Sequence, residues 1–558
     1  MAKKQTGKLT APKNRAQYNK QVRMGFKLHK QGKNLEALQY FTSAWKYDDT
    51  DAKVSIAVAD CLAKNGNKTA SMNLLEHVLQ KNPDNPNIAS ILGNTALSLN
   101  YFDLALKFHN LHMQLEPGEI VPYNNYATAL REAGQLDEAI DFLKDVIPIF
   151  PDKDALWNTL GATVGFRDGP GHAIVFYEEA LKIDPNNKQV LNNIGPAYYS
   201  VGEYKKAEEA GLKALKLDPN QADPKLFLFN FYVKQNQYDK AWDYYKGRKT
   251  RLHFNYSLRY HGKPYWNGQD LKDKKILIFA EQGIGDEIQF AWLYNQVIKD
   301  AKKVGLSCQD RLVNLFKYSF PNADVGSTVF LLNKKLDYNI YTCPDLEIEE
   351  YDYLFMAGDL MGQYWHNKED IQINNKPTLK PNPEIVDKWQ IEIEKLPHDI
   401  SVGIAWRSGL QYAKRARNYA SILDWVPFLK EKNINFVNVQ YGDCKDELEE
   451  LEKETGIKIH QIEGLDLKND IEGTTAMMTS LDLVMGPASA PLMQSGMAGV
   501  ESWIFSAGDP WWIFHEEYLP YQTNKRVLFK GINDPWPEFM EEQAPKFQKW
   551  LKDKRKEK

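Results

Sequence analysis

A period of 34 residues in the first half of the chain constrains its fold more than any other feature. Gly93, Gly161 and Gly195 share one phase of this period, and Ala127 fills the same phase between the first two. Two further sets keep the same step, namely the prolines Pro83, Pro117, Pro151, Pro185 and Pro219 and the small residues Ala37, Ser71, Ala105, Ala139, Ala173, Ala207 and Ala241. A chain that repeats itself at this interval folds as a stack of similar units.

Each period predicts two amphipathic helices. The small residue lies in the first turns of the second helix and lets it pack closely on the first, while the proline ends the second helix because it cannot continue the hydrogen-bond ladder. The pattern resembles the tetratricopeptide repeat, and segments such as QLDEAIDFLKDV and GEYKKAEEAGLKAL carry it. We expect about seven repeats across residues 18–250, forming a right-handed helical solenoid, preceded by a basic disordered arm at residues 1–17.

Three asparagines also follow the period. Asn124, Asn158 and Asn192 lie 34 residues apart on the expected first helix of three successive repeats. Amide side chains carry both donors and an acceptor, so a ladder of them on the concave face suits the backbone of an extended peptide. The alternative is that these asparagines only cap or solvate the helices. Because repeats of this kind mostly bind protein segments, we expect a protein partner.

The charge balance and the cysteines narrow the function classes. Of the 558 residues, 70 are Lys or Arg and 74 are Asp or Glu, so the net charge of −4 gives no argument for binding nucleic acid or an anionic membrane. Residues 1–30 hold nine Lys or Arg and no acidic residue. This composition favours a solvated arm, and the alternative is an arm that binds a polyanion. The four cysteines are far apart, no apolar run could span a membrane, and the N-terminus lacks a signal peptide. We therefore expect a cytoplasmic protein.

After residue 250 the period stops and strands begin to alternate with helices. Such alternation predicts parallel sheets, which makes the fold class α plus α/β, with a helical solenoid before two α/β halves. We expect a connector at 251–272, an N-terminal half at 273–380, a linker with a short helix at 381–397, a C-terminal half at 398–545 and a basic tail at 546–558. The expected strands are 275–279, 327–332, 338–342, 351–358, 400–406, 434–442, 457–462, 482–486 and, as the last, 500–505.

The first strand of this region leads into a glycine loop. Gly283 and Gly285 follow the strand, and an amphipathic helix begins near Asp286. Glycines let a ligand approach the backbone, and the helix N-terminus behind them favours anions. Ligands of such folds bind at the carboxyl ends of the strands, so we expect a cleft there between the two halves.

Several segments resemble one enzyme family. ILIFAEQGIGDEIQFAWLY, VGIAWRSG, NVQYGD, TSLDLVMG and AGDPWWIFHEEYLPYQTNKRVLFK resemble, in order and spacing, blocks of tetratricopeptide-repeat glycosyltransferases. The catalytic part of those enzymes is similar to the ADP-heptose:lipopolysaccharide heptosyltransferases of glycosyltransferase family 9. The resemblance covers about residues 260–550. It implies two Rossmann-like halves of the glycosyltransferase B type, with the acceptor and the base on the N-terminal half and the nucleotide sugar on the C-terminal half.

The resemblance also implies roles for individual residues. Asp286 corresponds to the general base that takes the proton of an acceptor hydroxyl, with Glu287 as its neighbouring substitute. The alternative for Asp286 is a purely structural role as the N-cap of its helix, and one residue can be both N-cap and base. No metal and no further cofactor is implied, since arginines and helix ends would carry the charge of the leaving group. The residues implied for the donor are Gly283, Gly285, Arg407, Ser408, Gly409, Arg415, Arg417, Gln440, Asp443 and Ser489.

Within that set, each residue type has its own purpose. The three arginines would surround the diphosphate, Ser408 and Gly409 would let the loop close, and Ser489 starts a helix that can hold phosphate. Gln440 and Asp443 would contact the base or the ribose. Arg415 and Arg417 have the alternative of being solvated loop charges.

One block departs from the family. The family pattern Asp-Thr-x-x-x-His is replaced by the run from Ala488 to Met493, so neither its Asp nor its His is present. Heptose is therefore not the expected sugar. We expect an inverting, metal-independent glycosyltransferase that moves another sugar from a nucleotide-sugar donor to an acceptor protein held by the repeats. The alternative is a non-catalytic tetratricopeptide scaffold with a degenerate glycosyltransferase domain.

Overall fold

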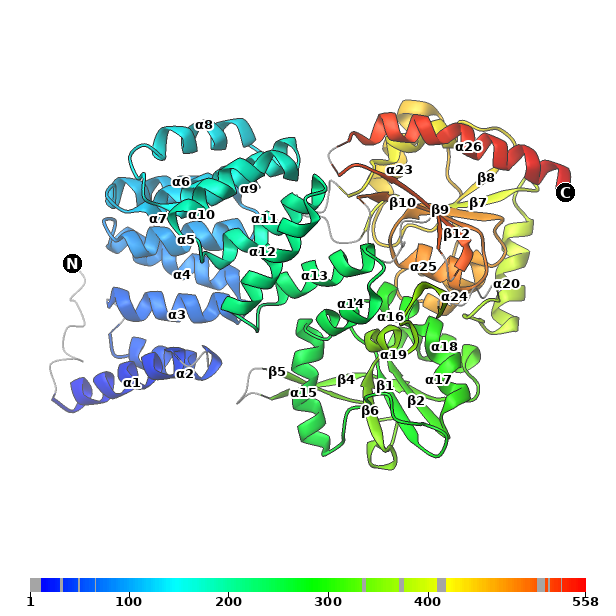
Figure 1. The fold of residues 1–558 in the computed structure, drawn as a ribbon, viewed down its shortest axis with the longest axis horizontal. Coiled ribbons are helices and arrows are strands. Elements are labelled where there is room, and N and C mark those ends of the chain that lie inside the picture. The colour runs from blue at the N-terminus through cyan, green and yellow to red at the C-terminus, as the bar shows by residue number, and fades with distance from the viewer. Residues whose placement is uncertain are drawn as a thin grey trace, which may run out of the picture. The chain divides into compact units, whose positions relative to one another are not determined.

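The computed structural model describes residues 12–30, 34–48, 51–65, 67–333, 338–370, 376–408, 418–508, 517–519, 522–532 and 534–558. The chain divides into two compact units (Figure 1). The second unit comprises Gly211–Leu331 and Asn339–Lys558, and the first unit comprises the rest. Each unit is described by itself.

The first unit consists of antiparallel helix pairs in chain order. Its helices are α1 (Pro12–Lys30), α2 (Asn34–Trp45), α3 (Ala52–Lys64), α4 (Lys68–Lys81), α5 (Pro86–Ser98), α6 (Phe102–Leu115), α7 (Ile120–Glu132), α8 (Leu136–Val146), α9 (Asp154–Asp168), α10 (Ile174–Ile183), α11 (Lys188–Ser200) and α12 (Tyr204–Leu217). Each odd-numbered helix from α1 to α9 packs on the helix after it. Helix α1 begins at Pro12, inside the predicted arm, and α12 crosses the boundary between the units.

The glycine phase of the period is explained by the packing inside each pair. An aromatic ring from the second helix lies flat against the glycine of the first, where a methyl group would come within 2.5–2.7 Å of the ring. The pairs are Gly25 with Phe41, Gly93 with His109, and Gly161 with Tyr177. Where alanine takes the phase, as at Ala127, the residue sixteen positions later is aliphatic and belongs to the same core cluster. The sequence period therefore encodes close helix packing.

The seventh helix pair belongs to the second unit. Helices α13 (Ala222–Lys234) and α14 (Tyr238–Tyr245) are followed by α15 (Lys249–His261), which lies in the predicted connector. Helix α14 packs on α19 (Leu360–Tyr364), and the Trp242 indole N–H donates to the carbonyl of Trp365 at 2.5 Å. The unit boundary after Ala210 therefore precedes the sequence boundary that we placed at residue 250.

The N-terminal half of the α/β region has a parallel four-stranded sheet in the order β3-β2-β1-β6. Its strands are β1 (Lys275–Phe279), β2 (Lys303–Cys308), β3 (Asp324–Ser327) and β6 (Tyr353–Met356). Strand β2 was not expected from the sequence. The expected strands at 327–332 and 338–342 correspond to a separate two-stranded sheet of β4 (Val329–Asn333) and β5 (Tyr338–Thr342). Helices α16 (Ile284–Phe290), α17 (Tyr294–Asp300) and α18 (Val313–Ser319) complete this half.

The C-terminal half has a six-stranded sheet in the order β11-β12-β10-β9-β7-β8, parallel except for β11. Its strands are β7 (Ser401–Ile404), β8 (Asn435–Asn438), β9 (Leu483–Pro487), β10 (Ser502–Ala507), β11 (Tyr518–Leu519) and β12 (Gln522–Lys530). Two expectations were wrong. The segment 457–462 makes only an isolated bridge, from His460 to Val437, and β10 is followed by two further strands. The segment 457–462 alternates apolar and polar residues, but among the residues described its ladder hydrogen bonds are confined to His460, which bonds to the backbone of Phe436 and Asn438.

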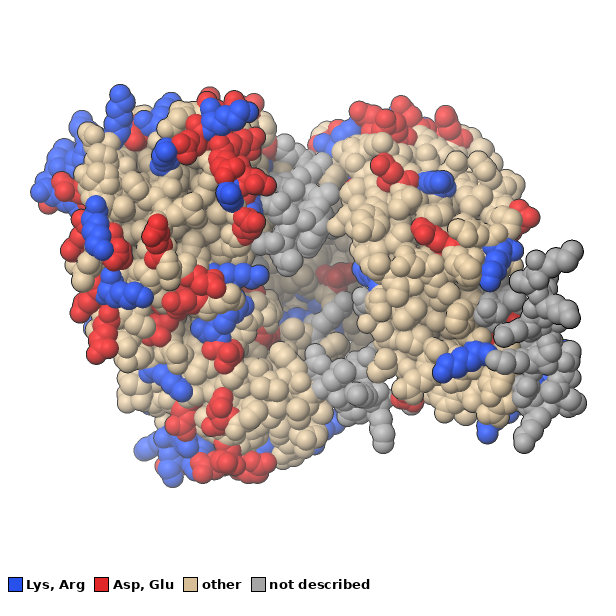
Figure 2. Space-filling model, turned by 180° about the vertical axis from the view of Figure 1, so that it is seen from behind, with Lys and Arg blue, Asp and Glu red and all other residues tan. Residues whose placement is uncertain are grey.

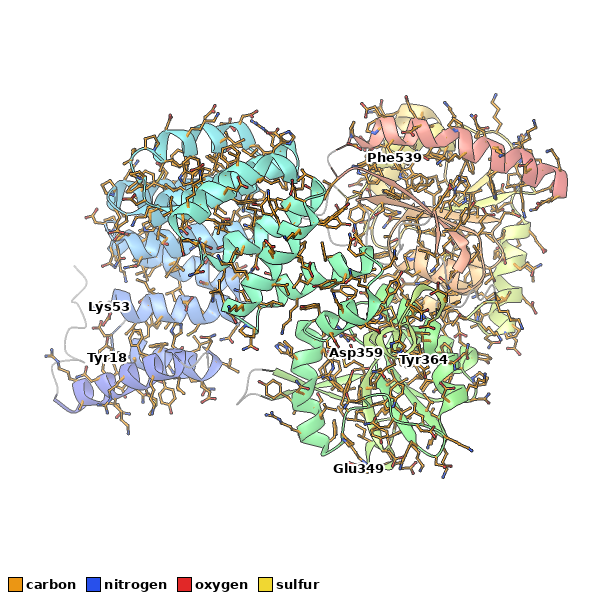
Figure 3. The ribbon with its side chains drawn as sticks, in the orientation of Figure 1. Tyr18, Lys53, Glu349, Asp359, Tyr364 and Phe539 are labelled. Carbon is orange, nitrogen blue, oxygen red and sulfur yellow. The ribbon has the colours of Figure 1, made fainter. Side chains whose placement is uncertain are left out.

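Six described helices complete this half, and one of them crosses a predicted boundary. They are α20 (Pro383–Glu394), α22 (Val426–Leu429), α23 (Lys445–Thr455), α24 (Ile471–Met478), α25 (Ala490–Met497) and α26 (Trp536–Glu557). Helix α20 fills most of the predicted linker. Helix α26 runs through the predicted tail, and Phe539, Phe547 and Leu551 are buried in one core cluster with the sheet (Figure 3 labels Phe539). The cationic tail is thus the charged face of a helix whose other face is core.

Short 3-10 helices connect several of these elements. They are η1 (Pro170–Ala173), η2 (Ala291–Leu293), η3 (Asp310–Leu312), η4 (Ile348–Glu350), η5 (Ala357–Asp359), η6 (Lys368–Asp370) and η7 (Ile422–Trp425).

Among the residues described, no helix combines the length and apolarity needed to cross a membrane. The four cysteines are buried thiols.

Candidate functional site

The candidate site lies where the carboxyl ends of strands from both sheets meet. Strand β1 leads through Gly283 into α16, strand β9 leads through Ser489 into α25, and the two helices pack on each other. A methyl group on Gly285 would lie 3.6 Å from the Cα of Ala490 and 3.7 Å from its amide nitrogen. The structure therefore brings together the glycine loop and the Ser489 helix start, which are about 200 residues apart in the sequence.

Asp286 occupies the first turn of α16. Its Oδ2 accepts a hydrogen bond from the Gly283 N–H at 3.2 Å, so the carboxylate closes the glycine loop onto the helix. The side chain is half-buried. Asp286 is therefore not the N-cap that we held as the alternative: the N-cap residue is Gly283, and Asp286 is the third residue of the helix, whose carboxylate reaches back to the N-cap in a capping box.

Glu287, the next residue, lies behind Asp286 in the protein interior. Its Oε2 accepts the Gln309 N–H at 2.9 Å, and 4% of the residue is exposed. Burial raises the pKa of Glu287 to about 7; the Gln309 hydrogen bond and the Arg311 charge act against burial, and the Asp286 charge acts with it. A carboxyl group with a pKa near neutrality is suited to exchanging protons at physiological pH.

Ser489 stands at the start of α25 with an unsatisfied hydroxyl group. The residue has extended backbone angles, and its side chain makes no capping hydrogen bond to the helix. Its Oγ is buried and, among the residues described, has no hydrogen-bond partner. A buried hydroxyl without a partner is unfavourable by about 1–3 kcal/mol, so a ligand that hydrogen bonds to it would recover that free energy.

Arg407 follows β7 and is held by protein groups. Its Nε donates to the two carboxylate oxygens of Glu447 at 2.7 and 2.9 Å, and its Nη2 donates to the Asp443 carbonyl at 2.7 Å. Trp406 donates its indole N–H to the same carboxylate at 2.9 Å. The Glu447 contact raises the pKa of Arg407 further. In this arrangement Arg407 joins the β7 loop to α23, and most of its guanidinium is already engaged.

Gln440 also makes its hydrogen bonds inside the protein. Its amide oxygen accepts the N–H groups of Trp406 and Arg407 at 3.1 and 3.0 Å, and its amide nitrogen donates to the Tyr441 carbonyl at 2.9 Å. The residue is 1% exposed. Gln440 therefore fixes the loop after β7, which is a supporting position for any ligand there.

The remaining residues predicted to bind the donor divide into two groups. Asp443 is exposed and accepts the Lys445 N–H at 3.2 Å, and the hydroxyl groups of Ser408 and Tyr441 are 3.4 Å apart. Three residues lie outside the residues described, namely Gly409, Arg415 and Arg417.

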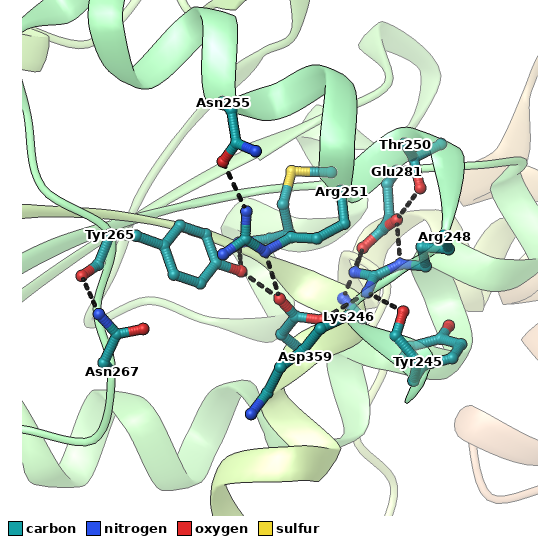
Figure 4. Close-up of polar contacts among 12 residues, drawn as sticks. Tyr245, Lys246, Arg248, Thr250, Arg251, Asn255, Tyr265, Asn267, Glu281 and Asp359 are labelled. Atoms are coloured by element: carbon teal, nitrogen blue, oxygen red, sulfur yellow. Dashed lines mark hydrogen bonds and ion pairs between the residues drawn. The ribbon is translucent and has the colours of Figure 1, made fainter. Parts of the chain in front are cut away.

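A buried ion-pair cluster beneath the glycine loop was missed by sequence reasoning (Figure 4). Glu281 lies two residues after the end of β1, and its side chain is completely buried. It accepts the Arg248 Nε–H at 2.8 Å, the Thr250 hydroxyl at 2.6 Å and the Gly358 N–H at 3.1 Å. A methyl group on Gly358 would lie 2.6 Å from the Glu281 carboxylate, so only glycine leaves room for this contact.

Asp359 forms the other acidic side of the cluster. Arg248 donates to it at 2.5 Å and Arg251 at 2.9 Å, and the Tyr265 hydroxyl also donates to it. The Arg248 guanidinium lies 4.3 Å above the ring centroid of Tyr245, the last residue of α14. No spacing in the sequence links these residues, because their contacts join segments up to 111 positions apart.

In the first unit, two of the three predicted asparagines link neighbouring repeats. The Asn124 Oδ1 accepts the Thr159 hydroxyl at 2.6 Å, and the Asn158 Oδ1 accepts the Asn193 amide at 2.9 Å. Asn192 is half-buried. On the face shown in Figure 2, charged side chains are sparse over the first unit and dense over the second. Asn124 and Asn158 thus serve the packing between neighbouring repeats.

Metal binding finds no support in the described part of the chain. Within it, no group of three or more His, Cys, Asp or Glu side chains is arranged to hold a metal ion.

Comparisons with known proteins identify the repeats and a relative similar over most of the chain. Tetratricopeptide repeat models match residues 28–95 and 189–221. Protein FlbA of Caulobacter vibrioides is 29% identical over 506 residues, which are 88% of this chain and 84% of FlbA, so the similarity extends through both units. The peroxisomal targeting signal receptor of Candida albicans is 32% identical over 83 residues, 15% of this chain and 14% of the receptor.

The solved structures align with only part of this chain. A tetratricopeptide repeat protein from Parabacteroides merdae aligns with a TM-score of 0.36 at 10% identity, covering 42% of this chain and 93% of that one. Yeast Tom70 aligns with a TM-score of 0.35 at 19% identity, covering 38% and 45%. Together with the family models, the helix pairs and their 34-residue period show that the N-terminal region of this chain consists of tetratricopeptide repeats.

Proposed function

We propose that the chain is an inverting, metal-independent glycosyltransferase, with its α/β part acting as two Rossmann-like halves of the glycosyltransferase B type. It transfers a sugar from a nucleotide-diphosphate donor to a protein recruited by the repeats. The alternative is a non-catalytic tetratricopeptide scaffold.

The observation that carries the proposal is the meeting of α16 and α25. The N-terminus of α25 favours a phosphate group, and the buried Ser489 hydroxyl beside it has no hydrogen-bond partner in the described part of the chain. Gly285, in contact with Ala490, places its neighbour Asp286 at the start of α25, with the buried Glu287 behind it. A site with an anion-binding helix start facing a carboxylate base has the two groups that displacement of a diphosphate needs.

The proposed reaction balances with these groups alone. The acceptor hydroxyl oxygen forms a bond to the anomeric carbon while the bond from that carbon to the diphosphate oxygen breaks. The proton of the hydroxyl passes to the Asp286 carboxylate, and the nucleoside diphosphate leaves with its charge held at the start of α25. Attack opposite to the leaving group inverts the configuration.

A protein acceptor follows from the repeats. A solenoid of helix pairs presents an extended surface that fits a polypeptide better than a small sugar. The named function of one partial relative, a receptor for a peroxisomal targeting signal, supports a polypeptide partner.

The experiment measures release of nucleoside diphosphate from a panel of nucleotide sugars, with and without a protein acceptor. We expect turnover with one donor and a loss of about 10²–10⁴-fold in Asp286→Asn, the range of general base catalysis. Asp424→Asn is the matched control, because Asp424 is half-buried and accepts the Ser421 N–H at 2.7 Å in the same capping geometry. Equal turnover in wild type and Asp286→Asn contradicts the base assignment.

The scaffold alternative is favoured by one specific observation. Arg407, expected at the diphosphate, is committed to Glu447 and the Asp443 carbonyl. A chain that neither binds nor turns over any donor, yet captures a protein partner, has the scaffold function.

A further inference from the structure

We propose that Arg248 and Thr250 are positioning residues, which hold the turn that carries Asp286 by clamping the Glu281 carboxylate beneath it. The catalytic part of this inference rests on the proposed function, whereas its structural part does not.

First, the turn after Glu281 is not in a conformation that its residues prefer. Gln282 has a φ of 67°, in the left-handed region that a side chain other than glycine disfavours. Such a residue is strained by about 1–2 kcal/mol and persists only where its surroundings hold it. Gly283 and the Asp286 carboxylate follow directly, joined by their 3.2 Å hydrogen bond.

Second, the contacts that hold this turn converge on Glu281. Its carboxylate accepts hydrogen bonds from Arg248, Thr250 and the Gly358 backbone, and no part of its side chain is exposed. With the second Arg248 donor, Nη2, the four acceptor sites of the carboxylate are filled, and this fixes the Glu281 side chain. Through Gly358 the same carboxylate also ties the carboxyl end of β6 to that of β1.

Third, the donors of the clamp come from outside the α/β fold. Arg248 lies between α14, the last helix of the repeat pattern, and α15. Thr250 is the second residue of α15. The Arg248 guanidinium stacks on the Tyr245 ring of α14. It donates hydrogen bonds to Glu281, to Asp359 and to the Tyr245 carbonyl. The segment that directly follows the last repeat therefore supplies the donors that position the proposed catalytic turn.

The test uses the full-length chain and a mild variant, Thr250→Val, which removes one hydroxyl donor to Glu281 and keeps the shape of the side chain. Hydrogen exchange of the peptide segment 280–290 reports the turn directly. We expect exchange to accelerate about five- to tenfold, and kcat to fall by a similar factor while the KM for the donor stays the same. Thr250→Ser, which keeps the hydroxyl, should restore both values.

Thr128→Val is the matched control. Thr128 is equally half-buried and donates its hydroxyl to the Asn124 carbonyl at 2.9 Å, within one helix of the first unit, so its loss should leave both readouts unchanged. Arg248→Lys is the stronger variant, since a lysine cannot bridge Glu281 and Asp359 with a planar fork. If Arg248→Lys fails to fold, the comparison of Thr250→Val with Thr250→Ser still tests the proposal.

The outcomes separate this inference from the proposed function. Unchanged exchange at 280–290 in Thr250→Val, or no rescue by Thr250→Ser, overturns the clamp. Accelerated exchange with unchanged kcat overturns the positioning of Asp286. If wild type turns over no donor, the glycosyltransferase proposal fails, and the exchange measurements alone support or overturn the clamp.

Discussion

The Glu287 carboxylate accepts the Gln309 backbone N–H at 2.9 Å, and this bond joins the first turn of α16 to the end of β2. The bond favours the ionised form, yet burial outweighs it and raises the pKa of Glu287 to about 7. Burial and one hydrogen bond thus act in opposite directions on the same group, and burial is the larger effect.

We predict that Glu287→Gln changes the pH dependence of stability. The folded pKa is raised above the unfolded value, so the wild type loses stability as pH rises from about 4.5 to 7. The variant should therefore gain relative to wild type across this window, by up to about 3 kcal/mol at pH 8. Urea unfolding at pH 5 and pH 8 checks this, and an equal difference at both pH values would contradict it.

A second prediction concerns Lys525 of β12, which is 1% exposed and packs its stem into the space left by Gly496. Burial lowers the pKa of Lys525 to about 7, so wild-type stability falls as pH drops from 10.5 through 7. Lys525→Met should stabilise the chain by about 2–4 kcal/mol at pH 6 and by little at pH 10. The exposed Lys556→Met is the control, and a pH-independent gain in Lys525→Met would contradict the explanation.

The third prediction concerns His109, whose ring covers Gly93 in the first unit. Burial, and secondarily the charge of His112, lowers the pKa of His109 to about 4, so stability is lost as pH falls from 6.5 towards 4. His109→Phe keeps a ring against Gly93. It should retain up to about 3 kcal/mol of the folding stability that wild type loses between pH 6.5 and 4. Thermal unfolding between pH 4 and 7 measures it. Tyr177→Phe, at the equivalent position over Gly161, should leave the acid dependence as in wild type.

The fourth prediction concerns Arg407 and Glu447, whose side chains are 13% and 29% exposed. Either Arg407→Met or Glu447→Gln should destabilise the chain by about 1–3 kcal/mol, because each leaves a partly buried charge without its partner. The double variant should lose less than the sum of the two. Chemical denaturation of the four proteins gives the coupling, and additive losses would show that the pair contributes nothing to stability.

Local patterns were readable in the sequence for a physical reason. The helix pairs of the repeats follow from contacts between residues about sixteen positions apart, such as Gly93 with His109, and these recur with every period. Strand–helix alternation likewise comes from short segments, and the glycine loop before Asp286 lies within one of them. By contrast, β2 and β12 were missed, and the segment 457–462 was wrongly expected to be a full strand. A strand needs a partner strand, and no short segment specifies its partner.

The amino-acid sequence by itself determined the repeats, the α/β character of the second half and the placement of Asp286 beside its glycines. Only the tertiary structure decided which groups meet: Gly285 with Ala490, Arg248 with Glu281 and Asp359, and Arg407 with Glu447. The physical reason is the range of the interactions. Helix periodicity and turns act over a few residues, whereas the burial of a charge and the choice of its partner depend on the whole packed chain.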